Sequence, residues 1–432
     1  MPQVLPLSLQ NRRPGRIRPE LGPLRAVLAR LGHPQLACPS ILIVGTNGKG
    51  STAAMLEAIL GAHGLRTGLT TSPHLVSVEE RIRIDGRRID PSSLDSHLDR
   101  LTADVDLTFF ETITAAAFLA FARSGVEVAI LEAGMGGSWD ATRVAESAIA
   151  GLTNVGSDHA DWLGADVMDR ARDKGAPLRT AKWSVVGPDV AAGLLPAVAA
   201  PEAVAAGDLV RVRGLDGDRV RVSWDTHEVE LELPLAGAHQ RGNLQLALAL
   251  AVCAGKAGLM RGLDPDAVIR GLENVSWPGR LTETRFGGRS VLLDGAHNLE
   301  GAEALAAELR RRRVVYNLLF SCLDDKPVEA MAKVLSPVVG DIAVCGLDDP
   351  RAMPMERLLA AFPAAEPVPS PEAGIGRLGD PVVAAGSRRL VGRGRELAEE
   401  GVVSCMGPSS VIVGASGRWE PRGSPSAPSD RP

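Results

Sequence analysis

A glycine-rich stretch at residues 45–52 has the residue types and the spacing needed to hold a phosphate group. It reads Gly-Thr-Asn-Gly-Lys-Gly-Ser-Thr, after four apolar residues at 41–44 and before a helical pattern at 53–60. A glycine loop between a buried strand and a helix turns sharply and presents backbone N–H groups to phosphate oxygens. Lys49 would reach the outer phosphates of a nucleotide, and Ser51 or Thr52 would offer a hydroxyl to Mg²⁺. The other loop residues predicted to contact phosphate are Thr46, Asn47, Gly48 and Gly50.

The loop departs from the common phosphate-loop pattern at two places. Ile43 stands where that pattern has its first glycine, and Gly50 separates Lys49 from the hydroxyl residues. A glycine turn without a ligand is the alternative interpretation. A lysine between two glycines has no packing purpose, which favours phosphate binding.

Three more polar clusters follow predicted strands, at residues 71–74, 132–137 and 154–159. Alternating strands and helices predict an α/β fold with a doubly wound, mostly parallel sheet, in which ligands bind at the carboxyl ends of strands. Glu132 at such an end suits Mg²⁺, which prefers oxygen ligands, although it could be a solvated acid. His159, beside Asp158, could bind a metal or orient a phosphate, or could be a surface residue next to a helix cap.

A second strand–helix series begins near residue 290 and carries further candidate residues. Asp294 and His297 follow its first strand, and with Arg280 and Asn243 they could grip a ribose, a base or a phosphate. Each is weak evidence alone, but together they predict an active site in a cleft between two domains. Lys174, by its sequence context, is one charge in a charged helix.

Composition limits the classes of function. The chain has 432 residues with 45% hydrophobic residues, 3% aromatic residues and a net charge of −5. This length favours two domains, and the mixed charge argues against nucleic-acid binding. No signal peptide or apolar run of membrane-spanning length is recognisable. Five scattered cysteines without a CxxC pair predict reduced thiols in a cytoplasmic protein.

The expected domains are residues 1–277, with the phosphate loop, and a smaller Rossmann-like α/β domain at 278–415, followed by a disordered tail at 416–432. Antiparallel strands at 208–233 would embellish the first sheet. The last strands are expected at 315–320, 341–345 and 402–405. Phe109 and Phe110 are the best candidates to stack on a flat ring, although a buried helix start explains them more simply.

With these motifs in order, the chain resembles the folylpolyglutamate synthase/dihydrofolate synthase family of the ATP-dependent Mur-ligase superfamily, from about residue 33 to about residue 346. Gly50, which breaks the common loop pattern, is the family's own form. The matching residues are 45–51, 71–75, 80–82, 131–137, 140–142, 153–154, 158–159, 162–164, 237, 239–240, 243, 277–280 and 294–298.

The resemblance implies an ADP-forming ligase. ATP would phosphorylate a pteroate or folate carboxylate, and L-glutamate would displace phosphate to form an amide. Lys49, His159 and Lys174 would be catalytic, and Asn243, Arg280, Asp294 and His297 would bind ATP. By the same resemblance, Ser51, Glu132 and His159 would hold one Mg²⁺. Ser72 and Lys174, the latter carboxylated by CO₂, would approach a second ion. The acceptor would be dihydropteroate, a reduced folate, or both, and the protein would be a monomer without nucleic-acid or membrane partners.

Two departures from the family pattern lie near this site. Arg143 stands where the family usually has asparagine, and Gly175 where it usually has alanine, before Ala176-Pro177 instead of Gly-Ile. They put the fine substrate geometry in question. They also leave open a nucleotide-binding protein that has lost catalysis. A Mur-type ligase with another acceptor is a further alternative.

Overall fold

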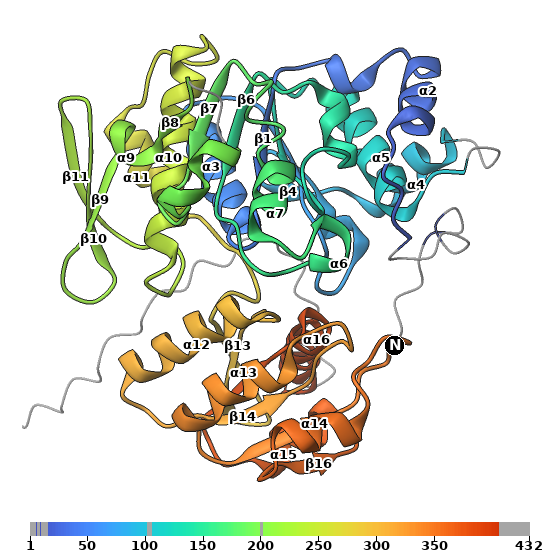
Figure 1. The fold of residues 1–432 in the computed structure, drawn as a ribbon, viewed down its shortest axis with the longest axis vertical. Helices are drawn as coiled ribbons and strands as arrows, with labels where there is room; N and C mark the ends of the chain where they lie inside the picture. The colour runs from blue at the N-terminus through green and yellow to red at the C-terminus, as the bar shows by residue number, and fades with distance from the viewer. Residues whose placement is uncertain (1–5, 7–8, 10–15, 102–105, 199–201, 406–432) are drawn as a thin grey trace, which may run out of the picture.

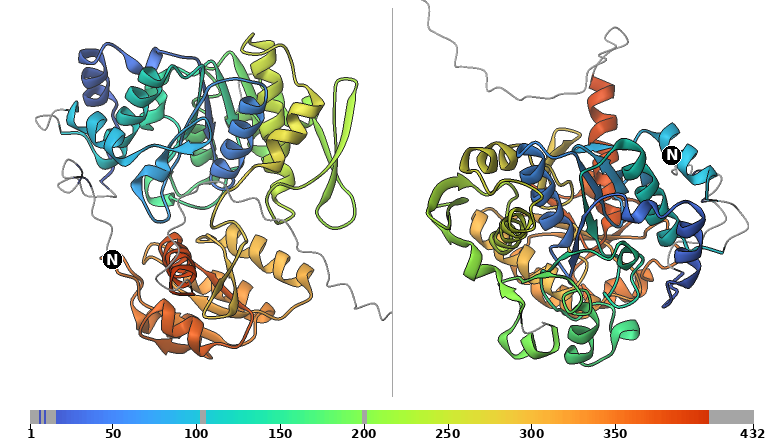
Figure 2. Two further views of the ribbon diagram at one scale, coloured as in Figure 1. Left: turned by 180° about the vertical axis from the view of Figure 1, so that it is seen from behind. Right: turned by 90° about the horizontal axis from the view of Figure 1, so that it is seen from above.

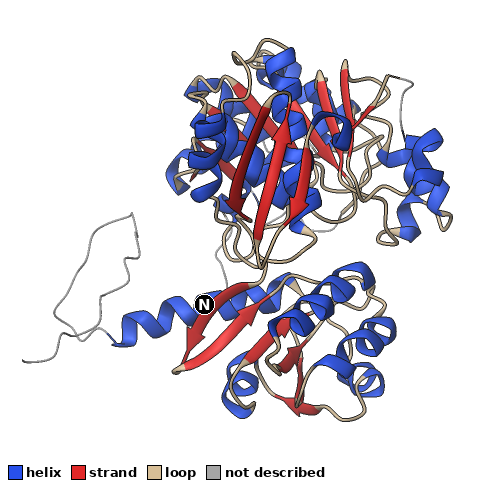
Figure 3. Cartoon of the chain, turned by 90° about the vertical axis from the view of Figure 1, so that its left-hand side faces the viewer, coloured by secondary structure: helices blue, strands red, loops and turns tan. Residues whose placement is uncertain are grey.

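The computed structural model describes residues 6, 9, 16–101, 106–198 and 202–405. The predicted tail at 416–432 lies outside the described residues. Figure 1 shows two units, one above the other, and Figure 3 shows the sheet of each unit with its helices. Among the described helices, none is long and apolar enough to cross a membrane.

The first unit is built on an eight-stranded sheet of order β4-β3-β2-β5-β1-β6-β7-β8. Its central pairs are parallel, and only the β2–β3 and β3–β4 pairs at one edge are antiparallel. The strands are β1 (Ser40–Val44), β2 (Thr67–Thr70), β3 (Ile82–Ile84), β4 (Arg87–Arg88), β5 (Val128–Glu132), β6 (Ile149–Leu152), β7 (Trp183–Val186) and β8 (Val204–Ala205). The predicted doubly wound, mostly parallel sheet is confirmed.

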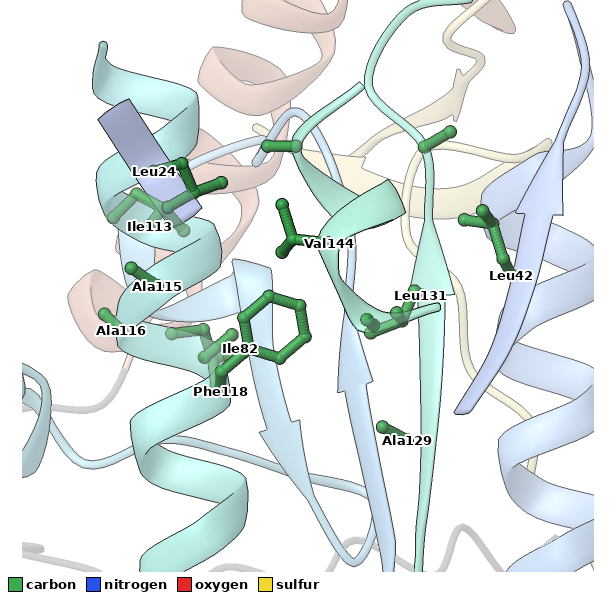
Figure 4. Close-up of a cluster of buried hydrophobic side chains, with 14 of the residues drawn as sticks. Leu24, Leu42, Ile82, Ile113, Ala115, Ala116, Phe118, Ala129, Leu131 and Val144 are labelled. Carbon is green, nitrogen blue, oxygen red and sulfur yellow. The ribbon is translucent and has the colours of Figure 1, made fainter. Parts of the chain in front are cut away.

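Helices cover both faces of this sheet because successive residues of β1 point to opposite sides. Leu42 packs in a cluster with residues of α2, α4 and α5, part of which Figure 4 shows. Ile41 and Ile43 pack on the other face with α3, α10 and α11. The helices of this unit are α2 (Gly22–Arg30), α3 (Lys49–Ala62), α4 (Pro91–Asp99), α5 (Phe109–Ser124), α6 (Ala160–Leu163), α7 (Val167–Lys174), α8 (Leu195–Val198), α9 (Ala206–Leu209), α10 (Gln240–Lys256) and α11 (Pro265–Glu273).

Shorter features of the first unit refine the expectations. The antiparallel strands expected near 208–233 exist as β9 (Arg211–Gly214), β10 (Arg219–Trp224) and β11 (His227–Glu232), but they form a sheet of their own. Phe109 is buried at the start of α5, the simpler of the two interpretations. The 3₁₀ turns are η1 (Pro34–Leu36), η2 (Val78–Arg81), η3 (Ala141–Ala145) and η4 (Ala192–Leu194).

The second unit carries a six-stranded sheet of order β12-β13-β17-β14-β15-β16, parallel except for the β12–β13 pair. Its strands are β12 (Thr282–Phe286), β13 (Arg289–Leu293), β14 (Asn317–Phe320), β15 (Ile342–Cys345), β16 (Glu366–Val368) and β17 (Val382–Ala385). Its helices are α12 (Leu299–Arg312), α13 (Val328–Leu335), α14 (Met355–Ala361), α15 (Pro371–Arg377) and α16 (Arg388–Cys405), with the turn η5 (Ser336–Val338). Figure 2 shows α16 from behind and from above.

The prediction of a strand at 402–405 was wrong, because these residues continue α16. A short apolar run fits a strand and a buried helix equally, and periodicity alone does not separate them. The last strand of the sheet is β17. Of the described cysteines, Cys253, Cys322 and Cys345 are buried and free, and Cys38 is free and partly exposed, as expected.

Candidate active site

The phosphate loop joins β1 to α3, as predicted. Gly48 has a left-handed conformation with φ of 84° and caps the N-terminus of α3. A Cβ atom at Gly48 would lie 2.1 Å from Oδ1 of Asn243, so only glycine lets α10 approach the loop this closely. The structure therefore brings Asn243 to the loop. The first N–H groups of α3 have no partner within the helix and are the ones free to meet an anion.

Asn154, which follows β6, forms hydrogen bonds with the first residues of the phosphate loop. Its Oδ1 accepts hydrogen bonds from the backbone N–H of Thr46 (3.3 Å) and of Asn47 (2.9 Å). The Thr153 hydroxyl donates to the Asn47 carbonyl over 2.6 Å, and the Gly156 N–H donates to the Thr46 hydroxyl over 2.8 Å. The backbone N–H groups of Thr46 and Asn47 thus fix the loop to β6.

Two lysines meet at one carbonyl oxygen under the loop. Lys49 Nζ donates to Gly45 O over 3.0 Å and to Thr46 O over 3.1 Å, and Lys174 Nζ donates to the same Gly45 O over 3.2 Å. Lys174 is only 1% exposed. Burial, followed by the Lys49 charge, lowers the pKa of Lys174 to about 7, and burial also lowers the pKa of Lys49. The helix α7 therefore carries Lys174 into the site, which its sequence context did not indicate.

Glu132, at the end of β5, lies beside the next loop. Its Oε2 accepts a hydrogen bond from the Ser72 N–H over 3.0 Å, and Arg388 Nη1 donates to the Ser72 carbonyl over 3.1 Å. Arg388 starts α16, so a second-unit guanidinium reaches the site of the first unit. Burial, followed by the Arg280 charge, lowers the pKa of Arg388 to about 10. Sequence reasoning missed Arg388.

The loop after β5 is ordered by Asp140. Its Oδ2 accepts the N–H groups of Gly134 (2.8 Å) and Met135 (3.0 Å), and its Oδ1 accepts the N–H and the hydroxyl of Thr142. These bonds explain the Asp-Ala-Thr sequence after the glycines. The carboxylate is a scaffold for the loop beside Glu132.

Asp158 joins the two units in a cluster of charges. Lys326 Nζ lies 2.9 Å from its Oδ1, and His297 Nε2 and His159 Nε2 lie 3.6 and 3.8 Å from its Oδ2. Burial works against ionisation of Asp158, but the Lys326 charge and the charges that His159 and His297 carry when protonated at low pH hold its pKa well below the usual range. Lys326 is a further residue that sequence reasoning missed.

The two histidines of this cluster are neutral. Burial lowers the pKa of His159 to about 4 despite Asp158, and burial followed by Arg388 lowers that of His297 to about 3. His297 Nδ1 lies 2.7 Å from the Gly295 carbonyl. A neutral imidazole offers the lone pair that a metal ion or a hydrogen-bond donor needs.

The residues after β13 lie against the first unit. Asn298 Nδ2 donates to Asn47 Oδ1 over 3.0 Å, and Glu300 Oε1 accepts the Ser157 N–H over 2.8 Å. Asp294 accepts the N–H groups of Leu281 and Ala296, and burial raises its pKa. These contacts place the 294–298 motif opposite the phosphate loop.

Arg280 and the predicted metal ligand Ser51 are the remaining site residues predicted from the sequence. A Cβ at Gly295 would lie 2.8 Å from Arg280 Nη1, so Arg280 lies beside this motif. Ser51 is 2% exposed, and the buried Thr52 Oγ1 has no hydrogen-bond partner in the described part of the chain. No group of three or more His, Cys, Asp or Glu side chains in that part is arranged to hold a metal. A metal here would therefore need hydroxyl or substrate oxygens as well.

Comparisons with known proteins identify the family of this chain. The Mur ligase middle domain model matches residues 43–173, and the model of the Mur ligase glutamate ligase domain matches residues 279–401. The dihydrofolate synthase/folylpolyglutamate synthase of Mycobacterium tuberculosis is 37% identical over 390 residues, which is 80% of this chain and 78% of that protein. The Bacillus subtilis protein of the same name is 32% identical, over 78% of this chain and 83% of its own length.

Solved structures of similar proteins superpose on most of this chain. The structure of Escherichia coli FolC in complex with DHPP and ADP superposes with a TM-score of 0.80 at 28% identity, covering 91% of this chain and 96% of that one. The Mycobacterium tuberculosis folylpolyglutamate synthase complexed with ADP and AMPPCP has a TM-score of 0.78 at 32% identity, covering 88% and 95%. The predicted resemblance and two-unit fold are confirmed, and the chain belongs to the folylpolyglutamate synthase/dihydrofolate synthase family of Mur ligases.

Proposed function

We propose that this chain is an ATP-dependent, ADP-forming ligase that joins L-glutamate to the carboxylate of a pteroate or folate. The observation that carries the proposal is the convergence of Lys49 and Lys174 on Gly45 O, where the Glu132 charge also acts on Lys49, in a member of this family. When both amines are protonated they repel each other, and an anion bound beside them offsets that repulsion. Supporting evidence comes from relatives whose structures contain ADP or its analogues.

The reaction needs a leaving group because an amine does not displace oxide from a carboxylate. An oxygen of the acceptor carboxylate attacks the terminal phosphorus of ATP, and ADP leaves. The glutamate nitrogen then attacks the acyl carbon, loses a proton and expels phosphate from the tetrahedral intermediate. Lys49 is placed to neutralise the phosphate oxygens, and the N–H groups at the start of α3 add fixed dipoles.

The side chains beside the loop fit Mg²⁺. Ser51 and Glu132 supply oxygen donors, the neutral His159 supplies a nitrogen, and the unpartnered Thr52 hydroxyl adds buried polarity. We assign the first ion to Ser51, Glu132 and His159. A related structure, from Yersinia pestis, contains AMPPNP and a manganese ion. When bound, the ion would neutralise charge on the transferring phosphoryl group.

Lys174 is proposed to carry a carboxyl group from CO₂. A pKa of about 7 leaves a large share of the amine neutral at physiological pH, and a neutral amine is the form that attacks CO₂. The resulting carbamate is an anionic oxygen donor, which with Ser72 would serve a second ion. We expect Lys174→Ala to lose activity and to recover part of it with a small carboxylic acid in solution. Full activity of this variant would remove Lys174 from the site.

Nucleotide binding is assigned to both units. Thr46 to Thr52 and Asn243 lie on the first unit, and Arg280, Asp294 and His297 lie on the second. The contact of Asn298 with Asn47 supports a site between them. We propose the division into domains after residue 277, with each sheet in its own domain, and we propose that one chain acts as a monomer.

The test is ADP release by the purified protein with ATP, Mg²⁺ and L-glutamate, comparing dihydropteroate with a reduced folate. We expect ADP only when both glutamate and an acceptor are present. Turnover with dihydropteroate identifies a dihydrofolate synthase, turnover with a reduced folate identifies a folylpolyglutamate synthase, and turnover with both identifies a bifunctional enzyme. Nucleotide binding without acceptor-dependent ADP release would refute the proposal.

A further inference from the structure

A hollow of about 340 Å³ lies on the first unit, away from the phosphate loop. It is formed by the β3–β4 hairpin, by α4 and by the last residues of α5, and we call it the basic hollow. Gly68 of β2 is paired with Ile84 of β3, and Thr70 with Ile82, so Ile84 lies at the end of the sheet opposite the active-site loops. The basic hollow is therefore separate from the active site.

Positive charge dominates the lining of the basic hollow. Arg87, Arg88 and Arg123 all face it, together with His97. Among the described residues, the guanidinium groups of Arg87 and Arg123 form no hydrogen bond or ion pair, and Arg88 has only a 3.9 Å contact with Glu80. An ordinary solvated surface mixes both signs of charge, whereas this one concentrates one sign around a concavity.

The acidic residue in the lining, Asp90, does not neutralise these arginines. Its Oδ1 accepts the N–H of Ser92 (2.9 Å), the hydroxyl of Ser92 (2.5 Å) and the N–H of Ser93 (3.3 Å), as the N-cap of α4. The carboxylate is committed to the helix terminus. The arginines thus have no anion of this chain as a strong partner within the described lining.

His97 provides an independent indication of a missing partner. The side chain is only 6% exposed, yet its Nδ1 has no hydrogen-bond partner within the described part of the chain. Burial, followed by the charges of Arg123 and Arg100, lowers the pKa of His97 and favours the neutral ring. A buried polar atom without a partner is costly. The His97 side chain lines the hollow, so a ligand bound there would lie next to the ring.

We propose that the basic hollow binds a small polyanion through Arg87, Arg88, Arg123 and His97. Guanidinium groups recognise carboxylate and phosphate oxygens with paired N–H donors, and three of them around one concavity favour a ligand with several anionic groups. Phosphates and polycarboxylates share this chemistry. The volume of the hollow is in the range of small-molecule sites.

Calorimetric titration tests the proposal on the full chain, saturated with ADP and Mg²⁺ so that the phosphate loop is occupied. Pyrophosphate and γ-linked triglutamate are the two probes, at fixed ionic strength, because screening alone changes weak charge interactions. We expect saturable binding of at least one probe. Preference for pyrophosphate assigns the hollow to phosphates, and preference for triglutamate assigns it to polycarboxylates.

The double variant Arg87→Gln/Arg123→Gln should weaken this binding at least tenfold. Both arginines are exposed, so the fold should be kept, as circular dichroism would verify. Arg213→Gln, an exposed arginine on β9, is the matched control and should bind as the unmodified protein does. The His97 ring resonances, assigned with His97→Gln, should shift on titration. Absence of saturable binding, or equal binding by the double variant, would overturn the proposal.

Discussion

Replacement of Lys174 by methionine should change how stability depends on pH. Lys174 is 1% exposed, and its pKa falls from the ordinary 10.5 to about 7. A tenfold change in an equilibrium corresponds to about 1.4 kcal/mol, so full protonation of this amine in the folded protein costs about 5 kcal/mol. Methionine has a similar length and no charge, so Lys174→Met removes this cost.

The sign of this pH dependence follows from the protons that Lys174 binds in the folded and the unfolded protein. Between pH 7 and pH 10.5 the unfolded chain keeps the proton on Lys174 while the folded protein releases it. Stability of the unmodified protein therefore rises with pH across this window, by about 2 kcal/mol between pH 7 and pH 9. Lys174→Met should lack this contribution and should be the more stable protein at the lower pH.

Urea unfolding of both proteins at pH 7 and pH 9 measures the difference. The buffers must be free of CO₂ and nucleotide, so that neither a carbamate nor a ligand contributes. Comparing the two proteins cancels the other titrating groups, which are the same in both. Lys256→Met, at the exposed end of α10, is the control and should follow the unmodified protein. Equal pH dependence of Lys174→Met and the unmodified protein would refute the burial argument.

Three further variants test individual contacts. Lys49→Ala should lower the rate of ADP formation at least 100-fold, with an unchanged urea midpoint; retained turnover would contradict the phosphate role. Gly48→Ala would place a Cβ 2.1 Å from Asn243 Oδ1 and should weaken ATP binding, measured by calorimetry, at least tenfold. Gly64→Ala is the control, because Gly64 also has a positive φ but has open space around it, and it should leave ATP binding unchanged. Lys326→Met removes a charge that lowers the pKa of His159 and of His297, so both histidines should titrate at higher pH by NMR. Unchanged pKa values would contradict the electrostatic coupling of Lys326 to these two histidines.

Residues next to strand ends were predictable because the pattern is local. The stretch from 41 to 60 indicates strand, loop and helix by composition alone, and Glu132 ends an apolar run. Parallel strands bring their carboxyl ends to one edge, so the grouping of these residues followed from fold class. Sequence alone therefore predicted most of the candidate site in the first unit.

Residues that act across the two units were harder to predict. Arg388 and Lys326 belong to the second unit and gain their importance only from contacts with Ser72 and Asp158. Nothing in the local sequence of an arginine at a helix start indicates such a contact. Lys174 was predicted only through family resemblance, because its burial depends on how α7 packs under the phosphate loop.

The two departures from the family pattern, Gly175 and Arg143, each have a local structural explanation. A Cβ at Gly175 would lie 2.4 Å from the Val198 carbonyl oxygen, so glycine allows α8 to pack closely against the end of α7. Arg143 donates to the Thr180 hydroxyl over 2.9 Å. Neither contact involves Lys49, Glu132 or a residue of the second unit. Because Gly175 lets the helix that carries Lys174 pack against α8, packing explains this departure, and it is no argument for a protein that has lost catalysis.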